Sequence, residues 1–407
     1  MDGAREPAGA PGRDPGYETD LAQEKRADYR VYEITGPPDD LGRQMASRRP
    51  DLGGPPLESL TPEQVDFARA CAAVLAREYP AALAEVEAMA AAYGRPVEEA
   101  YWFLSVGLTE APARGLVTSR RRRMGKARAA DPADEADEGR GDPDPAPPGC
   151  STVAVLTADG PVVGRNYDFF YWATTRHLIT TRPAPPPGPP EAATPPPQPA
   201  RWPDRGGPLA HVGMYDGLLA GRHDGMNEAG LFASLHGVRS APPARRRPGL
   251  FSVLVVRIVL ETCRTAREAV ERIRSLPHLA SYNYLVADDR EVFVVEAHPE
   301  RTRVREAENG VLAATNHFRH PDMVGLGRKA PSGSVARYRF LSETAARLRP
   351  ASAETVAGLM RDHKTPVCGH ADGMATFWSA VALPAARRVS YCLGAPCRND
   401  YTHTTVW

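Results

Sequence analysis

The sequence lacks any long run of apolar residues. No stretch reaches the roughly 20 residues that a membrane-spanning helix needs, and the polar segment from Met1 to Asp28 has no apolar core of signal-peptide length. We therefore expect a globular protein of the cytoplasm that has no membrane partner.

The chain also lacks an excess of charge of either sign. Its 50 lysines and arginines balance 50 aspartates and glutamates, so the formal net charge is zero. Domains that bind nucleic acids usually carry a basic surplus, and we expect no nucleic-acid partner here. The local basic runs at 120–123 and 245–247 are interpreted as solvated loops.

Cysteine is scarce as well. Six cysteines at irregular spacings do not form the disulfide framework of a small secreted protein. A group of histidines and cysteines near the C-terminus raises the hypothesis of a zinc site, but its spacings, H-x4-C-x-H and C-x4-C, fit no standard zinc finger. These residues are His363, Cys368, His370, Cys392 and Cys397. We expect them to pack around the core, and we expect neither a metal nor a cofactor.

One cysteine lies in a pattern that indicates catalysis. The motif Gly-Cys-Ser-Thr at 149–152 opens an apolar strand, and an Ala-Asp-Gly turn leads into a second strand at 162–168. This turn places Cys150 roughly opposite Asp168, with Arg165 nearby. Directly opposed residues have Cβ atoms about 5 Å apart. We therefore expect the thiol, the carboxylate and the guanidinium to form one cluster.

Such a thiol needs activation, because a pKa of about 8.5 leaves only a few per cent thiolate at neutral pH. Arg165 supplies a nearby cation. A base becomes available if the Gly149–Cys150 bond is cut, because the freed α-amine has a pKa of about 8. The pattern indicates a cysteine that becomes a new N-terminus. The alternative is that Cys150 is an unreactive cysteine buried in a strand.

Composition divides the chain into four parts. They are a disordered N-terminus (1–28), a mainly helical region (29–118), a flexible linker ending at the predicted cleavage site (119–149) and a catalytic domain (150–407). The catalytic domain contains a proline-rich insert at 183–203, which we expect to form a polyproline II excursion.

The order of predicted elements indicates an α+β sandwich rather than a doubly wound fold. Thr61, Pro62 and Gln64 match the start of a helix, with a capping box. Helices are predicted at 61–79, 80–93, 96–104, 248–274, 334–348 and 353–361. Strands are predicted at 29–34, 232–235 and 311–315, and further hairpins at 282–296 and 378–393.

Eight motifs stand in a characteristic order along the chain. They are GCST, GRNYDF, GMNEAGLFAS, NYLVADDREVFVVEAHP, LAATNHF, SGSVARYRFL, DHKTPVCGH and WSAVALPAARRVSYCLGAPC. Over roughly residues 29–405 the chain resembles the autoproteolytic cysteine N-terminal-nucleophile (Ntn) hydrolases. The specific resemblance is to the acyl-coenzyme A:6-aminopenicillanic-acid (isopenicillin N) acyltransferase-like family, to which choloylglycine hydrolases and penicillin V acylases are related.

The resemblance implies an αββα fold, in which two mainly antiparallel sheets lie between helical layers. It also implies an inactive precursor that cuts itself between Gly149 and Cys150. The two products would be chains 1–149 and 150–407, which stay together.

The resemblance further implies the roles of the site residues. Cys150 is the nucleophile and the autocatalytic residue, and its own amine is the base. Arg165 and Asp168 orient and polarise the thiol. Asn316 donates to the oxyanion, a contribution of roughly 3–4 kcal/mol for such donors, and Arg337 supports the site. From the residue type alone, a turn former at a strand end is the preferred interpretation of Asn316.

The implied substrate is a small-molecule amide or thioester. Cys150 would take its acyl group and pass it to water or to an amine, so we expect a hydrolase of non-peptide C–N bonds or an N-acyltransferase with acyl-coenzyme A as co-substrate. The family's usual Cys-Thr is Cys150-Ser151 here, and the insert at 183–203 falls where pocket loops are expected. The substrate class therefore stays open.

Two other functions are compatible with the sequence. A papain-like thiol protease would pair Cys150 with His317 and need no free amine. A catalytically silent family member would act as a binding protein through the proline-rich insert.

Overall fold

The computed structural model describes residues 27–49, 55–106, 149–170, 175–184, 207–215, 220–240, 246–348, 350–365, 367–370 and 374–407. Most of the predicted disordered N-terminus, the linker up to residue 148 and the proline-rich insert after residue 184 lie outside these ranges. None of the helices in the described part is long and apolar enough to cross a membrane.

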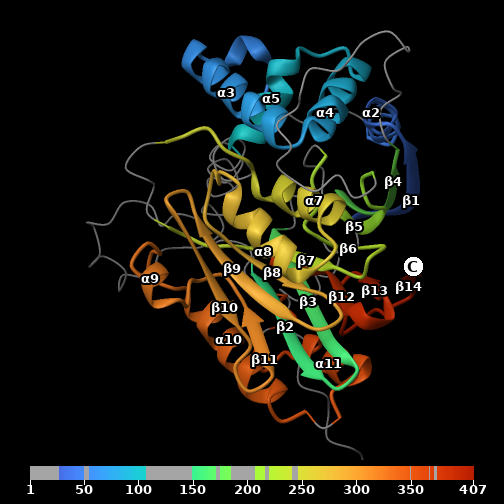
Figure 1. Ribbon diagram of the computed structural model, residues 1–407, viewed down its shortest axis with the longest axis vertical. Helices are drawn as coiled ribbons and strands as arrows, with labels where there is room; N and C mark the ends of the chain where they lie inside the picture. The colour runs from blue at the N-terminus through green and yellow to red at the C-terminus, as the bar shows by residue number, and fades with distance from the viewer. Residues whose placement is uncertain are drawn as a thin grey trace, which may run out of the picture.

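Two β-sheets form the centre of the molecule (Figure 1). The large sheet has eight strands in the order β1-β4-β5-β6-β7-β8-β9-β10, and the small sheet has six in the order β11-β2-β3-β12-β13-β14. Neighbouring strands are antiparallel except for β1 and β4. The strands are β1 (Asp28–Gly36), β2 (Cys150–Thr157), β3 (Gly160–Phe170), β4 (Thr175–Pro183), β5 (His211–Tyr215), β6 (Asp224–Asn227), β7 (Phe232–Gly237), β8 (Tyr282–Ala287), β9 (Val292–His298), β10 (Arg301–Glu306), β11 (Val311–Ala314), β12 (Met374–Leu383), β13 (Arg388–Leu393) and β14 (His403–Val406).

A pair of helices covers the outer face of each sheet. Helices α7 (Ser252–Thr262) and α8 (Ala266–Ser275) pack on the large sheet, and α10 (Ser332–Ala345) and α11 (Ala353–Met360) pack on the small one (Figure 1). The short α9 (Pro321–Val324) lies beside β10. The layers therefore follow the order αββα, which confirms the predicted α+β fold.

Side chains along the strands of the small sheet point alternately to its two faces, and each face belongs to a different apolar core. Val153 and Val155 of β2 pack against α10 and α11, whereas Ala154 packs between the sheets. On β3, Val163 and Tyr167 also lie between the sheets. Because side chains alternate with a period of two, Cys150 belongs to the core between the sheets.

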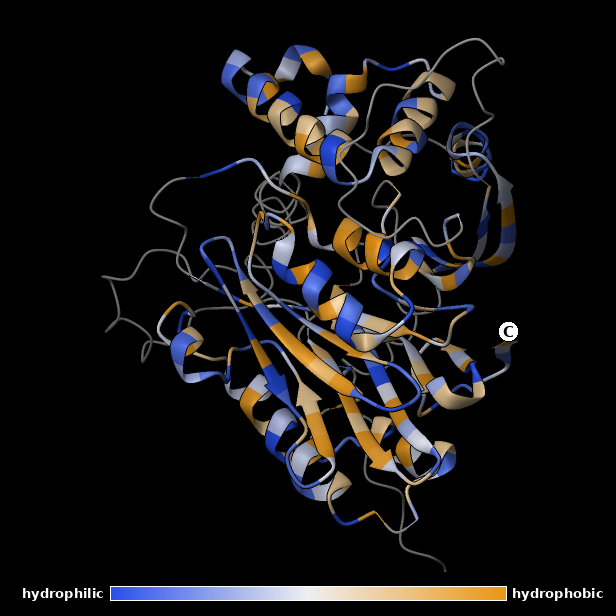
Figure 2. Ribbon diagram, viewed as in Figure 1, coloured by the Kyte–Doolittle hydropathy of each residue, from blue (hydrophilic) through white to orange (hydrophobic). Residues whose placement is uncertain are grey.

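The N-terminal helices cover the side of α7 that faces away from the large sheet (Figure 1). They are α2 (Pro38–Ala46), α3 (Pro62–Glu78), α4 (Pro80–Ala92) and α5 (Val97–Val106). Helix α3 begins as predicted, since the Thr61 side chain accepts from the Gln64 N–H and the Gln64 side chain accepts from the Thr61 N–H. Helix α7 is buried from Ser252 to Glu261. Figure 2 shows that most of its residues are hydrophobic, drawn in orange. It is buried because the sheet lies on one side of it and the N-terminal helices on the other.

A buried charge network links the N-terminal helices to α7. Arg257 donates to Glu261 within α7 at 2.6 Å and to Glu85 of α4 at 2.9 Å, and the side chains of the Arg257–Glu85 pair are only 2% and 1% exposed. The hydroxyl of Tyr79 donates to Glu261. Breaking such a buried pair on one side typically costs about 3–5 kcal/mol. The network therefore ties the two regions together in one specific arrangement.

Candidate active site

Cys150 is the first residue of β2, and its register differs from the prediction. It lies opposite Tyr167, whereas Asp168 lies beside Gly149 and donates its backbone N–H to the Gly149 carbonyl at 2.8 Å. The turn consists of only two residues between Thr157 and Gly160, so the pairing is shifted by one residue from a turn centred on Asp159. The predicted opposition of Cys150 and Asp168 is therefore wrong by one position.

This register separates the predicted residues onto two faces of the small sheet. Cys150 and Arg165 lie on the face between the sheets, because Arg165 pairs with Thr152 and side chains alternate. Asp168 lies on the other face, toward α10. The backbone at Gly149 and Cys150 therefore has Arg165 on one face of the sheet and Asp168 on the other.

The Cys150 thiol is 2% exposed. Burial raises its pKa, Arg165 and Arg337 oppose this effect, and Asp168 adds to it. In the uncut chain the thiol is therefore protonated at neutral pH and needs a base to react.

Arg165 is held by a buried carboxylate. Its Nε donates to Asp224 of β6 at 2.7 Å, and both side chains have an exposed fraction of 0%. Its Nη1 lies 3.2 Å from the His236 Nε2, while its Nη2 makes no hydrogen bond to any residue in the described part of the chain. Arg165 is thus fixed in place, and its positive charge lowers the pKa of the Cys150 thiol against the effect of burial.

Sequence reasoning missed Asp224. Its carboxylate also accepts from the Trp378 indole N–H at 2.8 Å and from the Tyr391 hydroxyl at 3.0 Å. The only sequence signal for Asp224 is that this charged residue directly precedes the GMNEAGLFAS motif, at the start of a buried strand.

His236 of β7 was likewise matched to no motif. Its Nε2 lies 2.7 Å from the Thr152 hydroxyl and its Nδ1 lies 3.1 Å from the Asn283 carbonyl oxygen. Burial, followed by the charge of Arg165, lowers its pKa well below the usual value. His236 is therefore a neutral imidazole, and its Nδ1–H donates to Asn283.

Asp168 and Gly149 are in close contact. The Thr376 hydroxyl donates to the Asp168 Oδ1 at 2.6 Å, and burial raises the pKa of this carboxyl to about 6 although Arg337 opposes the shift. A Cβ atom at position 149 would lie 2.8 Å from the Asp168 Oδ2. Only glycine therefore allows the backbone to approach the carboxylate this closely.

Asn316 and Arg337 hold the backbone of Cys150. The Cys150 N–H donates to the Asn316 Oδ1 at 2.8 Å, and the Arg337 Nη2 donates to the same oxygen at 3.1 Å. The Arg337 Nη1 donates to the Cys150 carbonyl and to the Ser151 hydroxyl, each at 2.8 Å. The amide nitrogen of Asn316 donates to the Gly237 carbonyl at 3.0 Å. The role of Asn316 as an oxyanion donor stays a prediction.

His317 has other partners than the cysteine. Its Nδ1 lies 2.8 Å from the Ser334 hydroxyl and 3.2 Å from the Thr315 hydroxyl, and burial lowers its pKa to about 4. Within the described residues, none of its hydrogen bonds joins it to Cys150. A papain-like mechanism needs that contact, so the geometry does not favour it.

Several solved structures are similar to this chain. They include the Caenorhabditis elegans ortholog of N-acylethanolamine-hydrolyzing acid amidase, with a TM-score of 0.41 and 16% identity over 63% of this chain and 99% of that one. A mutant conjugated bile acid hydrolase from Clostridium perfringens has a TM-score of 0.38 and 13% identity over 63% and 96% of the two chains. Penicillin V acylase from Agrobacterium tumefaciens has a TM-score of 0.37 and 14% identity over 60% and 82%.

No curated protein sequence matches the chain. One protein-family description, acyl-coenzyme A:6-aminopenicillanic acid acyl-transferase, matches residues 155–398. The matched range contains Arg165, Asp168, Asn316 and Arg337, and it begins shortly after Cys150. Because this match spans more than half of the 407 residues, the chain belongs to the acyl-coenzyme A:6-aminopenicillanic acid acyl-transferase family.

Proposed function

We propose that the chain cuts its own Gly149–Cys150 bond and then uses Cys150 as an N-terminal nucleophile on an amide or a thioester. One observation carries this proposal: both ends of the scissile bond are held by groups suited to its cleavage. The Asp168 N–H donates to the Gly149 carbonyl, and the Asn316 oxygen accepts from the Cys150 N–H, each at 2.8 Å.

The cleavage proceeds through a thioester. The Cys150 sulfur attacks the Gly149 carbonyl carbon, and the Asp168 N–H stabilises the oxyanion that forms. The C–N bond then breaks, and the thiol proton passes to the nitrogen, which becomes the α-amine of Cys150. Water finally hydrolyses the thioester, leaving a carboxylate on Gly149 and a free thiol on Cys150.

Asp168 is the base that we assign to this step. With a pKa of about 6, its carboxyl is mostly ionised at neutral pH. Its Oδ2 lies against Gly149, and its Oδ1 is fixed by Thr376. The thiol and this carboxylate lie on opposite faces of the small sheet, and both flank the Gly149–Cys150 peptide bond. We assign to the carboxylate the transfer of the thiol proton past this bond to the leaving nitrogen.

After the cut, the same groups serve the reaction with substrate. The α-amine of Cys150 remains next to the Asn316 oxygen and acts as the base for the thiol, while the positive charge of Arg165 stabilises the thiolate. The acyl group of the substrate is transferred to sulfur and then to water or an amine. Hydrolysis of an amide is our first assignment, and acyl transfer from acyl-coenzyme A is the second, which the description of the family supports.

The contacts between the N-terminal helical region and the catalytic domain support the proposal that the cleaved chains stay together. One continuous apolar core contains residues of α2, α4 and α5 together with α7, α8 and the large sheet. The Arg257–Glu85 pair joins the same two regions. Cutting the chain before Cys150 removes none of these contacts.

Acyl-enzyme trapping tests the proposed function. We expect the processed protein, mixed with a panel of N-acyl anilides and acyl-coenzyme A thioesters and then quenched in acid, to carry one acyl group on Cys150. Peptide mass spectrometry identifies the modified residue, and release of the free acid or of an acylated amine separates hydrolysis from transfer. Cys392→Ser is the matched control and should acylate normally. Turnover through an unmodified Cys150, or acylation of another cysteine, would contradict the proposal.

A further inference from the structure

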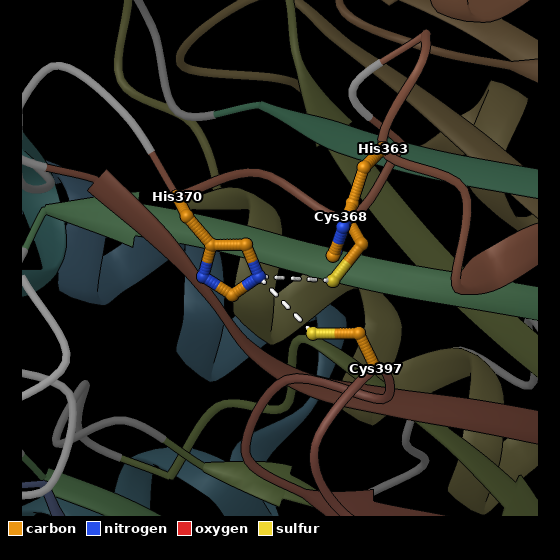
Figure 3. A group of neighbouring side chains, drawn as sticks. All are labelled: His363, Cys368, His370 and Cys397. Atoms are coloured by element: carbon orange, nitrogen blue, oxygen red, sulfur yellow. Dashed lines mark hydrogen bonds between the residues drawn. The ribbon is translucent and has the colours of Figure 1, made fainter. Parts of the chain in front are cut away.

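A second cluster of reactive side chains lies where the segment between α11 and β12 meets the segment that follows β13. It consists of His363, Cys368, His370 and Cys397, whose metal-binding atoms all lie within 4.8 Å of one another. Figure 3 shows the side chains converging from two segments of the chain. Three come from the segment that follows α11, and Cys397 comes from the segment that follows β13. The mechanism above uses none of them.

The two separations between nitrogen and sulfur atoms at His370 match those of a tetrahedral zinc site. The His370 Nε2 lies 3.4 Å from the Cys368 sulfur and 3.3 Å from the Cys397 sulfur. Zinc binds sulfur at about 2.3 Å and nitrogen at about 2.0–2.1 Å, so tetrahedral geometry places sulfur and nitrogen ligands about 3.5 Å apart. The rings of His363 and His370 are nearly perpendicular, with their centroids 5.3 Å apart. The two imidazoles therefore do not stack, and each offers one ring nitrogen to the cluster.

Cys392, the fifth member of the group noted in the sequence, does not belong to the cluster. Its thiol donates to the carbonyl oxygens of Gly394 and Asn399 at 3.4 and 3.5 Å. The spacing fitted no standard finger because Cys397 joins from a distant segment of the chain, which a local motif cannot reveal.

We propose that His363, Cys368, His370 and Cys397 bind one zinc ion in a structural site. Two thiolates and two imidazoles are soft and borderline ligands that favour zinc over magnesium or calcium. The two thiolate charges balance the charge of the ion. Four protein ligands leave no open position for a substrate, so the site is structural rather than catalytic.

The ion would fix the segment that supports Asp168. Gly369, between two of the ligands, donates its N–H to the Thr376 hydroxyl at 2.9 Å and accepts from the Thr376 N–H at 2.9 Å. That hydroxyl in turn donates to Asp168. Zinc would therefore act on the active site by positioning Thr376, without touching the substrate.

Metal analysis of the protein produced from the whole 407-residue sequence, whether cut or uncut, tests this site. The protein is produced with zinc in the medium and purified in reducing buffer without chelators. We expect about one zinc ion per chain by inductively coupled plasma mass spectrometry. Cys397→Ser and His370→Gln should each reduce zinc retention after dialysis by at least about tenfold. Cys392→Ser, the matched control, should retain the wild-type content.

A cobalt titration of the wild-type protein keeps the test valid if the variants fail to fold. Cobalt in this site should give the intense visible bands of a tetrahedral ion and thiolate charge-transfer absorption, and zinc should displace both. Folded wild-type protein that retains no zinc and gives no such spectrum would overturn the proposal. A disulfide between Cys368 and Cys397 in the purified protein, or equal zinc loss in Cys392→Ser, would also overturn it.

Discussion

The Gly149→Ala protein is expected to accumulate as an uncut chain. The added Cβ would lie 2.8 Å from the Asp168 Oδ2 and 3.3 Å from the Arg337 Nη2. Relief of this clash requires a shift of either the Gly149 carbonyl or the Asp168 carboxylate. The Thr376 hydroxyl holds that carboxylate through a hydrogen bond of 2.6 Å. A displacement of about 1 Å at a reacting group can cost about 100-fold in rate, so we expect cleavage to slow by roughly that factor.

A time course of the fraction cleaved, followed by denaturing electrophoresis, measures this effect. Gly358→Ala is the matched control, because a Cβ at this position of α11 meets no atom within 4 Å. The control should cleave at the wild-type rate. Since a misfolded chain would also stay uncut, circular dichroism must show that Gly149→Ala is folded. A folded Gly149→Ala protein that cleaves as fast as wild type would contradict the proposed geometry.

Asp224→Ala is expected to destabilise the protein by about 3–5 kcal/mol, because it leaves the buried guanidinium of Arg165 without its charge partner. The Trp378 indole and the Tyr391 hydroxyl would lose their acceptor as well. Urea unfolding measures the free energy of unfolding. The Cys150→Ala background is expected to keep the protein as one chain, and coincident transitions by fluorescence and circular dichroism must show that a two-state analysis applies.

Two variants separate this explanation from a general sensitivity to mutation. Asp322→Ala removes a pair of the same length, 2.7 Å, whose side chains are 40% and 50% exposed, and it should cost at most about 1 kcal/mol. Adding Arg165→Met to Asp224→Ala should restore part of the lost stability, because no unpaired charge then remains in the core. Equal losses for Asp224→Ala and Asp322→Ala would refute the importance of the buried pair.

The elements that sequence reasoning predicted best are those with strong local signals. The capping box at Thr61 and the hairpin between β12 and β13 form as predicted, and the hairpin after Cys150 forms with its pairing shifted by one residue. Strand β10 was missed, because its sequence RTRVRE carries charges on an edge of the sheet and lacks the apolar alternation of a half-buried strand. Strands β4 and β5 were missed next to the proline-rich insert.

The proximity of the candidate residues was predictable from the sequence more than their geometry. Motif resemblance singled out Cys150, Arg165, Asp168, Asn316 and Arg337, and the structure brings them together around one peptide bond. The register error at Cys150 arose because a hairpin turn one residue longer or shorter changes every facing pair. Asp224 and His236 escaped because their partners come from other strands. The histidines and cysteines near the C-terminus were named from the sequence, but their spacing could not show that Cys392 lies outside the cluster.

The central claim is that Cys150 cuts the chain before itself and becomes its N-terminal nucleophile. The most direct test is the intact mass of the purified wild-type protein beside Cys150→Ala under denaturing conditions. We predict two wild-type chains, one ending at Gly149 and one beginning at Cys150, and a single full-length Cys150→Ala chain. A wild-type protein that stays full length after long incubation, or a Cys150→Ala protein that is cut at the same bond, would contradict the claim.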